Sequence, residues 1–309
     1  MPARFLLVLV PLLLAACGPA SENPLPPSPD LDALAEQIDT LAAAHPEATV
    51  AVAIRDAATG TRFDRESDRS FHAASTMKVP VLIELFRQAE AGRFSLDDSL
   101  LLVNEFRSIV DGSPYQIEAD SDTALYARLG EPVAIRTLAE RMTTHSSNLA
   151  TNLLIAHVEA DSVQATIERL GTTSMRVLRG VEDIPAYRAG LSNSATAADL
   201  AALMTALGRR EAVSPEADAA MEAILLDQRY NTMIPAGLPE GARVAHKTGW
   251  ITRIHHDAAL VYPEPGTVSD TPYTLVVLTE GIDEHAVSSA LGASIAEAVH
   301  ATLRPKAAG

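Results

Sequence analysis

Ser75 and Lys78 stand three residues apart in the segment 71–80, FHAASTMKVP, in mostly apolar company. A serine hydroxyl is a weak nucleophile until a neighbouring base takes its proton. On a helix, side chains three residues apart share a face, and a buried lysine close to a second cation has a lowered pKa and can act as that base. The pair predicts a nucleophilic serine activated by a lysine, although so short a pattern also arises by chance.

Lysine is rare in this chain, which makes its position informative. Of the 24 lysine and arginine residues, three are lysines: Lys78, Lys247 and Lys306. An arginine stays charged, whereas the compact lysine ammonium can lose its proton when buried. Genome composition can set the overall ratio, but it does not explain why two of the three lysines lie in motifs suited to catalysis.

The second motif is His145-Ser146-Ser147-Asn148, which lies between two apolar helical stretches. The Ser146 hydroxyl could pass a proton to a leaving nitrogen, and the Asn148 amide could hold a substrate amide. Taken alone, the same four residues are also typical of a helix N-cap.

The third motif is Lys247-Thr248-Gly249 on a predicted strand. Lys247 and Thr248 could bind an anionic carboxylate, and Gly249 leaves room beside the strand for a substrate. The backbone N–H of Trp250 could join that of Ser75 as an oxyanion hole, a feature that often contributes most to the catalysis of acyl transfer.

In this order the three motifs resemble those of the penicillin-recognising serine enzymes, specifically the class A β-lactamase-like family. The resemblance extends from about Leu31 to Leu303. It implies that Ser75 is acylated, that Lys78 helps to activate it and that Ser146 relays the proton. It implies further that the substrate is a β-lactam or a cell-wall peptide-like amide, that no cofactor or metal is needed, and that the β-lactamase/transpeptidase-like fold carries the site.

The predicted elements agree with that fold, an α/β (α+β) architecture in which an antiparallel sheet is flanked by N- and C-terminal helices. Helices are expected from 31 to about 41, 75–91 and 284–303, and strands near 50–54 and 63 and over 243–248, 254–262 and 273–279, with a helical middle between them. Residues 31–73 and 214–309 would form the α/β domain, and residues 74–213 an inserted all-α domain.

Two features depart from the family pattern near the second motif. Ser147 stands where the family usually has an aspartate. The interval between Ser75 and Ser146 also looks long and contains an acidic stretch, residues 117–122. Such a stretch could border the cleft, but solvated surface is the interpretation that we favour for it.

A third departure concerns deacylation. Class A β-lactamases carry a Glu-x-x-Leu-Asn motif, whereas here Glu182 is followed four residues later by Ala186. Turnover near once per second corresponds to a barrier of roughly 17 kcal/mol, and an acyl-enzyme that lasts about an hour to roughly 22 kcal/mol. Glu182 is either the base that lowers the barrier to deacylation by this difference, or a surface carboxylate paired with Arg179 or Arg188.

The function predicted is therefore β-lactam hydrolysis through a serine acyl-enzyme. One alternative is a penicillin-binding, peptidase-like or esterase-like enzyme with slow deacylation, and another is an inactive lipoprotein that binds cell-wall peptide. A net charge of −16 and 4% aromatic residues argue against a nucleic-acid partner. On a strand His255 and Asp257 face away from His256, which argues against a metal site there. The resemblance implies instead that His256 lies near the cleft rim, where the family often has a basic group. A monomer is expected.

The N-terminus is typical of an exported lipoprotein. Arg4 precedes the apolar run 5–16, which is too short to span a bilayer but suits a signal peptide over residues 1–16. Cys17, the single cysteine, follows Leu14-Ala15-Ala16 as in a lipobox, although an ordinary cleavage site could also precede it. Residues 17–30 are predicted to be a proline-rich tether. With Gly18 after the cysteine, the sequence favours a periplasm-facing protein, anchored by lipid in the outer membrane.

Overall fold

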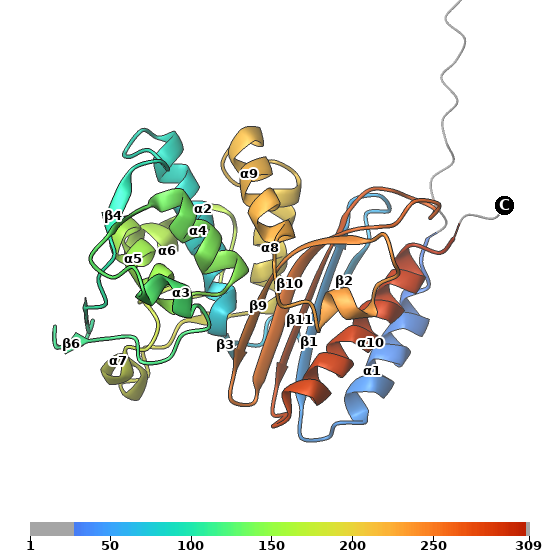
Figure 1. Ribbon diagram of the computed structural model, residues 1–309. Coiled ribbons are helices and arrows are strands. Elements are labelled where there is room, and N and C mark those ends of the chain that lie inside the picture. Colours follow the sequence, from blue (N-terminus) through green and yellow to red (C-terminus); the bar gives the residue numbers. More distant parts are fainter. Residues whose placement is uncertain (1–27, 307–309) are drawn as a thin grey trace, which may run out of the picture.

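A five-stranded antiparallel sheet, in the order β2-β1-β11-β10-β9, forms the centre of the computed structural model, which describes residues 28–306 (Figure 1). The strands are β1 (Thr49–Asp56), β2 (Arg62–Arg65), β9 (Arg243–Ile251), β10 (Ile254–Tyr262) and β11 (Tyr273–Glu280). The first part of the chain thus supplies two adjacent strands of the sheet and the last part the other three. This antiparallel sheet, with helices at both ends of the chain, confirms the predicted fold class.

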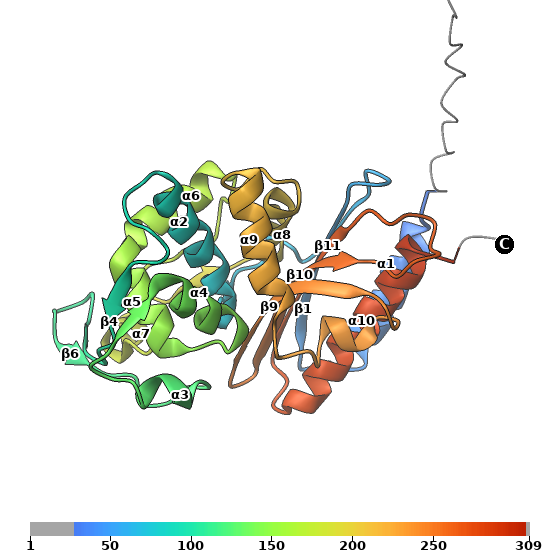
Figure 2. The same cartoon turned by 45° about the horizontal axis from the view of Figure 1, so that its top comes forward.

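Both faces of the sheet are covered, and the side chains of β1 alternate accordingly. Val50, Val52 and Ile54 pack in one apolar cluster with α1 (Leu31–Ala43) and α10 (His285–Leu303). Ala51 and Ala53 belong to the other cluster, on the side of α8 (Ala197–Gly208). A strand buried on both faces is apolar throughout rather than at alternate positions. Figure 2 shows α1 and α10 together on the outer side of the sheet.

The remaining helices lie mostly beside the sheet, on the side away from α1 and α10 (Figure 1). They are α2 (Lys78–Glu90), α3 (Thr123–Tyr126), α4 (Ile135–Thr144), α5 (Asn148–Val158), α6 (Ala160–Arg169), α7 (Ile184–Arg188) and α9 (Pro215–Leu226), with the 3₁₀ turn η1 (Ala74–Met77). A second 3₁₀ turn, η2 (Ile234–Gly237), packs instead against α10. Short strand pairs join them: β3 (Phe71–His72) with β8 (Ser194–Ala195), β4 (Ser99–Leu101) with β7 (Pro132–Ala134), and β5 (Phe106–Arg107) with β6 (Pro114–Tyr115). Within residues 28–306, no helix combines the length and apolar character needed to cross a membrane.

Helix boundaries follow the expected capping chemistry with small differences. The Thr196 hydroxyl accepts the backbone N–H of Asp199 at the start of α8, and Ser214 caps α9 in the same way. The helix predicted over 75–91 starts instead as the 3₁₀ turn η1, and α2 begins at Lys78. The strand predicted to end at 248 continues to Ile251. The division into an α/β and an all-α domain stays a prediction.

A buried ion pair links the segment after α10 to the end of β1. Arg304, just after α10, donates to both carboxylate oxygens of Asp56 at the end of β1, at 2.9 and 2.7 Å. Neither side chain is exposed. Burial is the largest effect and disfavours the charged carboxyl of Asp56. The hydrogen bonds from Arg304, Thr59 and the N–H of Ala58, together with the charge of Arg304, outweigh it, and the pKa of Asp56 is lowered. The pair therefore joins the first and last parts of the described chain through two buried charges that compensate each other.

Candidate active site

Ser75 lies on the 3₁₀ turn η1, half-buried at one wall of a cleft of about 540 Å³. Ala74 just before it has a left-handed φ of 46°, and its N–H donates to His72 Nδ1 at 3.0 Å. Strand β9 passes close to this turn at Gly249. A Cβ atom at Gly249 would lie 2.9 Å from the backbone nitrogen of Ser75, so that only glycine fits.

The side chain of Lys78 is buried at the start of α2 and points to the second motif. Its Nζ donates to the carbonyl oxygen of Ser146 at 2.6 Å, to Ser146 Oγ at 3.1 Å and to Asn148 Oδ1 at 3.0 Å. Burial, and then the nearby charge of Lys247, lowers the pKa of Lys78 well below its ordinary value, against an opposing effect of Asp120 and Glu182. Within residues 28–306 no hydrogen bond joins Nζ to Ser75, so acting as its base requires an exchange of partners.

The second motif has two roles at once. Ser147, which is fully buried, caps α5 by accepting the N–H of Ala150 at 3.2 Å. Ser146 before it has a left-handed φ of 55° and faces the cleft together with Asn148. The helix-cap interpretation of the motif therefore applies to Ser147, and it leaves Ser146 and Asn148 available to a substrate.

Lys247 approaches the same hydroxyl from the opposite side. Its Nζ donates to Ser146 Oγ at 3.2 Å and to the carbonyl oxygen of Thr248 at 2.8 Å. Burial lowers the pKa of Lys247 to about 7, with a smaller opposing effect from Asp257. Thr248 and Trp250 line the cleft beyond Lys247, and the Trp250 side chain is 60% exposed.

Glu182 borders the cleft with a left-handed φ of 61°. Its Oε1 accepts from Asn148 Nδ2 and its Oε2 from the N–H of Glu118, both at 3.0 Å. Arg179 donates instead to the carbonyl oxygens of Leu191 and Gly180. Glu182 is thus held by Asn148 and Glu118, and Arg179, one of the two arginines that the sequence offered as its partner, is bonded elsewhere.

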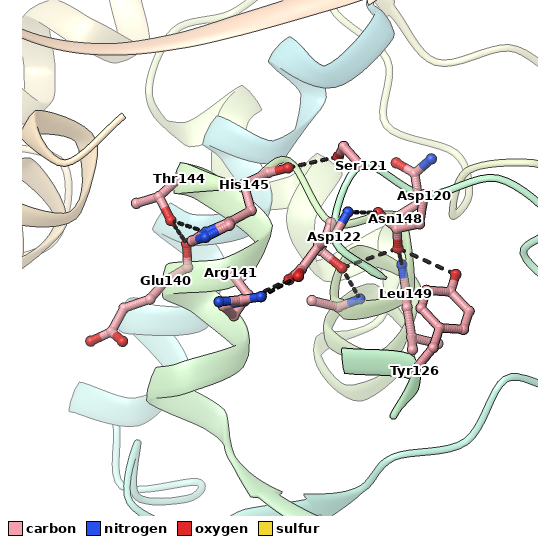
Figure 3. Close-up of polar contacts among 12 residues, drawn as sticks. Asp120, Ser121, Asp122, Tyr126, Glu140, Arg141, Thr144, His145, Asn148 and Leu149 are labelled. Carbon is pink, nitrogen blue, oxygen red and sulfur yellow. Dashed lines mark hydrogen bonds and ion pairs between the residues drawn. The ribbon is translucent and has the colours of Figure 1, made fainter. Parts of the chain in front are cut away.

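Two expectations about neighbouring residues are wrong. The acidic stretch 117–122, interpreted as solvated surface, lies along the cleft, where Ala119, Asp120 and Ser121 line the wall. Figure 3 shows the polar contacts of Asp120 and Ser121. His256, expected near the rim, is fully buried and bonds through Nε2 to the carbonyl oxygen of His72 at 3.0 Å. It faces the helical side because alternate residues of β10 point to opposite faces of the sheet.

Four cleft residues were missed by the sequence analysis: Tyr230, Thr232, His255 and His285. The His255 and His285 rings stack with centroids 4.3 Å apart, and Trp250 packs edge-on against His285. No local motif marks them, because they reach the cleft from separate segments. Among residues 28–306, no group of three or more His, Cys, Asp or Glu side chains is arranged to hold a metal ion.

Comparisons with known proteins agree with this geometry. A sequence profile of the "Beta-lactamase enzyme family" matches residues 33–303. A β-lactamase of Rhodobacter capsulatus is 24% identical over 247 residues, which cover 77% of this chain and 80% of that protein. The profile match spans nearly the whole described part of the chain. The chain therefore belongs to the β-lactamase enzyme family and is a β-lactamase-like hydrolase.

Solved structures are similar over most of the chain. The crystal structure of a β-lactamase from Sphaerobacter thermophilus has a TM-score of 0.74 and 27% identity, covering 88% of this chain and 97% of that one. The structure of PBP-A has a TM-score of 0.76 and 27% identity, covering 89% and 97%. A mutant of PBP-A, 28% identical, was solved as an acyl-enzyme complex with penicillin G, with a TM-score of 0.76 and coverage of 89% and 98%.

Proposed function

We propose that the protein hydrolyses β-lactams through an acyl-enzyme on Ser75. The observation that carries the proposal is the buried Lys78, whose pKa is lowered well below its ordinary value. Its Nζ is hydrogen-bonded to Ser146 and Asn148, and the residue directly follows the 3₁₀ turn η1 that carries Ser75, called the serine turn below. A neutral lysine amine in that place is a base for a serine hydroxyl. Belonging to the β-lactamase family supports the substrate class.

In the acylation step, Lys78 takes the proton of Ser75, whose Oγ attacks the lactam carbonyl carbon. The backbone N–H groups of Ser75 and Trp250 stabilise the oxyanion that forms. The C–N bond then breaks, and the proton passes from Lys78 through Ser146 to the leaving nitrogen. The bonds from both lysines to Ser146 Oγ suit this relay.

Substrate binding uses the other cleft residues. Thr248 at the cleft wall and Lys247, buried directly behind it, would bind the substrate carboxylate, and Asn148 the amide beside the ring. Asn148 can do so with its Nδ2 only by giving up or sharing its bond to Glu182. Gly249 lets the substrate lie along β9.

Deacylation by Glu182 completes the cycle. In that step Glu182 takes a proton from water, whose oxygen attacks the ester carbonyl carbon. The bond between that carbon and Ser75 Oγ then breaks, and the proton passes from Glu182 to Ser75 Oγ. The position of Glu182 at the cleft, bonded to Asn148, supports this role. The experiment is a comparison of penicillin and cephalosporin hydrolysis by the protein and its Glu182→Gln variant, with adducts followed by mass spectrometry. Drug consumption that falls about a hundredfold or more, with a persistent adduct, supports Glu182, and unchanged turnover excludes it.

The second candidate function is that of a penicillin-binding enzyme that acylates and then stalls. The similarity to PBP-A favours it, as does the involvement of both Glu182 carboxylate oxygens in hydrogen bonds with Asn148 and Glu118. In that case a stoichiometric adduct forms on Ser75 without sustained drug consumption, and Glu182→Gln changes little.

A lipid anchor at Cys17 is proposed on the sequence alone, because this residue lies outside the described ones. Export by the segment 1–16 would place the enzyme in the periplasm, where β-lactams and cell-wall peptides occur. The test is metabolic labelling with a radioactive fatty acid, in which Cys17→Ser should lose the label and leave the membrane fraction. Equal labelling of the two proteins would exclude the anchor.

A further inference from the structure

The second motif has Ser147 at the position where the family usually has an aspartate. A carboxylate from another segment of the chain, that of Asp120, lies beside Ser147 instead. Asp120 comes from the segment between β6 and α3. Its Oδ1 accepts the N–H of Asn148 at 3.0 Å, and its Oδ2 accepts the N–H of Leu149 at 2.8 Å and the hydroxyl of Ser147 at 3.2 Å. One side chain thus binds the three residues that follow Ser146 (Figure 3).

The segment that carries Asp120 is fixed on both sides of the motif. Asp122 forms an ion pair with Arg141 of α4, and its N–H donates to Asp120 Oδ1 at 3.1 Å. Ser121 Oγ donates to the carbonyl oxygen of His145 at 2.6 Å, just before Ser146. Figure 3 shows these bonds beside the end of α4, next to those that Asp120 accepts from Asn148 and Leu149 at the start of α5. These bonds therefore hold the segment that carries Asp120 in one position against the second motif.

The charge of Asp120 also acts on the proposed base. The charged groups that face Lys78 are Lys247 from β9, Asp120, and Glu182 from the segment before α7. Lys247 lowers the pKa of Lys78, and Asp120 is the first of the two carboxylates that oppose this. Asp120 itself accepts from the Tyr126 hydroxyl at 3.3 Å, and its charge contributes to raising the pKa of that tyrosine.

We propose that Asp120 is a positioning residue of the reaction, which supplies from the acidic stretch 117–122 the carboxylate that the second motif lacks at Ser147. It fixes Ser146 and Asn148 at the start of α5 and sets the electrostatic environment of Lys78. A carboxylate that accepts backbone N–H groups at a helix N-terminus is well suited to the first of these tasks. This proposal rests on the proposed role of Lys78 as the base.

The test compares the acylation rate of Ser75 by penicillin G, as a function of pH, in three variants of the full chain. Asp120→Asn removes the carboxylate. Glu118→Gln is the matched control. It removes an equal charge from an exposed side chain two residues away, and it keeps the backbone N–H of residue 118 that donates to Glu182. Asp120→Asn combined with Ser147→Asp moves the carboxylate onto the motif itself.

Asp120→Asn should slow acylation by at least about tenfold, since an amide cannot accept all the bonds that the carboxylate accepts. The acid limb of the pH profile should also move to lower pH. Acylation needs neutral Lys78, and loss of a nearby negative charge lowers the pKa of that lysine. Glu118→Gln should change neither quantity, and the double variant should recover both.

The proposal is overturned if Asp120→Asn and Glu118→Gln behave alike, or if the slower acylation comes with an unmoved acid limb and no rescue. Should Asp120→Asn alone fail to fold, the double variant decides: a normal profile supports the proposal, and a slow, shifted profile contradicts it. A failure of the proposed role of Lys78 looks different. In that case Ser75 of the Lys78→Arg variant would be acylated at the normal rate, whatever the effect of Asp120→Asn.

Discussion

Lys78 and Lys247 donate to one and the same acceptor, the Oγ of Ser146, at 3.1 and 3.2 Å. Because the two lysines share this acceptor, their buried ammonium groups lie close together. Burial lowers the pKa of Lys78, and repulsion from the charge of Lys247 lowers it further. The arrangement explains why lysine and not arginine stands at both positions. One of the two groups can release its proton while the other keeps a charge for an anionic substrate.

Replacement of Lys78 by arginine should keep the positive charge and still abolish acylation. A guanidinium does not give up its proton, so the rate of Ser75 acylation should fall by about a hundredfold or more. The measurement is stopped-flow acylation with a chromogenic cephalosporin. Lys306→Arg, an exposed lysine far along the chain, is the control and should behave as the unchanged protein does. Normal acylation in Lys78→Arg would exclude lysine as the base.

The pH dependence of kcat/KM should be bell-shaped for a β-lactam that carries a carboxylate. On the acid side the rate falls as Lys78 gains a proton, at a pH well below the ordinary lysine value. On the alkaline side it falls above about pH 7, where Lys247 loses the charge that binds the carboxylate. Rates measured from about pH 5 to about pH 9 test both limbs. An ester of the same substrate should lose the alkaline fall, and an equal fall for the ester would rule out this role of Lys247.

Gly249→Ala should damage the site more than the fold. The new Cβ would lie 2.9 Å from the Ser75 nitrogen and 3.0 Å from that of Thr76, so that β9 and the serine turn must move apart. Because a small displacement of catalytic groups is costly, acylation should fall about a hundredfold. Thermal melting of the same variant shows whether the fold persists. Retained acylation would show that the turn and the strand need not approach so closely.

The buried pair of Asp56 and Arg304 should contribute strongly to stability, because removing one partner leaves the other charge buried and alone. Arg304→Met should lower the free energy of unfolding by about 3–5 kcal/mol. The exposed pair of Arg128 and Glu131 offers the control, since Arg128→Met should cost at most about 1 kcal/mol. Denaturant unfolding measures both, and equal losses would contradict the argument.

The same pair predicts how stability depends on pH. The pKa of Asp56 is lower in the folded protein than its ordinary value of 3.8. The stabilisation is therefore complete above pH 3.8, and it is lost as the pH falls through the lower, folded-state pKa. The free energy of unfolding, measured as the pH is lowered below 3.8, should fall in the unchanged protein. The Arg304→Met variant should not show this loss.

The three motifs could be predicted from the sequence because each is continuous along the chain. Ser75 with Lys78, Ser146 with Asn148, and Lys247 with Thr248 each need only local spacing to be recognised, and the structure brings all six together. The order of helices and strands was predictable for the same reason, since periodicity and caps such as Thr196 are local signals.

The rest of the site depends on packing between distant segments. Asp120 reaches the second motif because Asp122 pairs with Arg141 and Ser121 bonds to His145. No periodicity in the acidic stretch indicates those contacts. His255 and His285 stack across two elements, which a sequence without a known fold does not reveal. Which histidine of the His255-His256 pair faces the cleft depended likewise on the register of β10.

The most direct test of the account is to find the residue that penicillin G modifies. The protein and its Glu182→Gln variant are mixed with the drug, quenched in acid at successive times, and analysed by intact mass and peptide mapping. The account predicts an added mass equal to the whole drug, located on Ser75 in at least one of the two proteins and absent from Ser75→Ala. Drug consumption by Ser75→Ala at the normal rate, or an adduct on another residue, would contradict it.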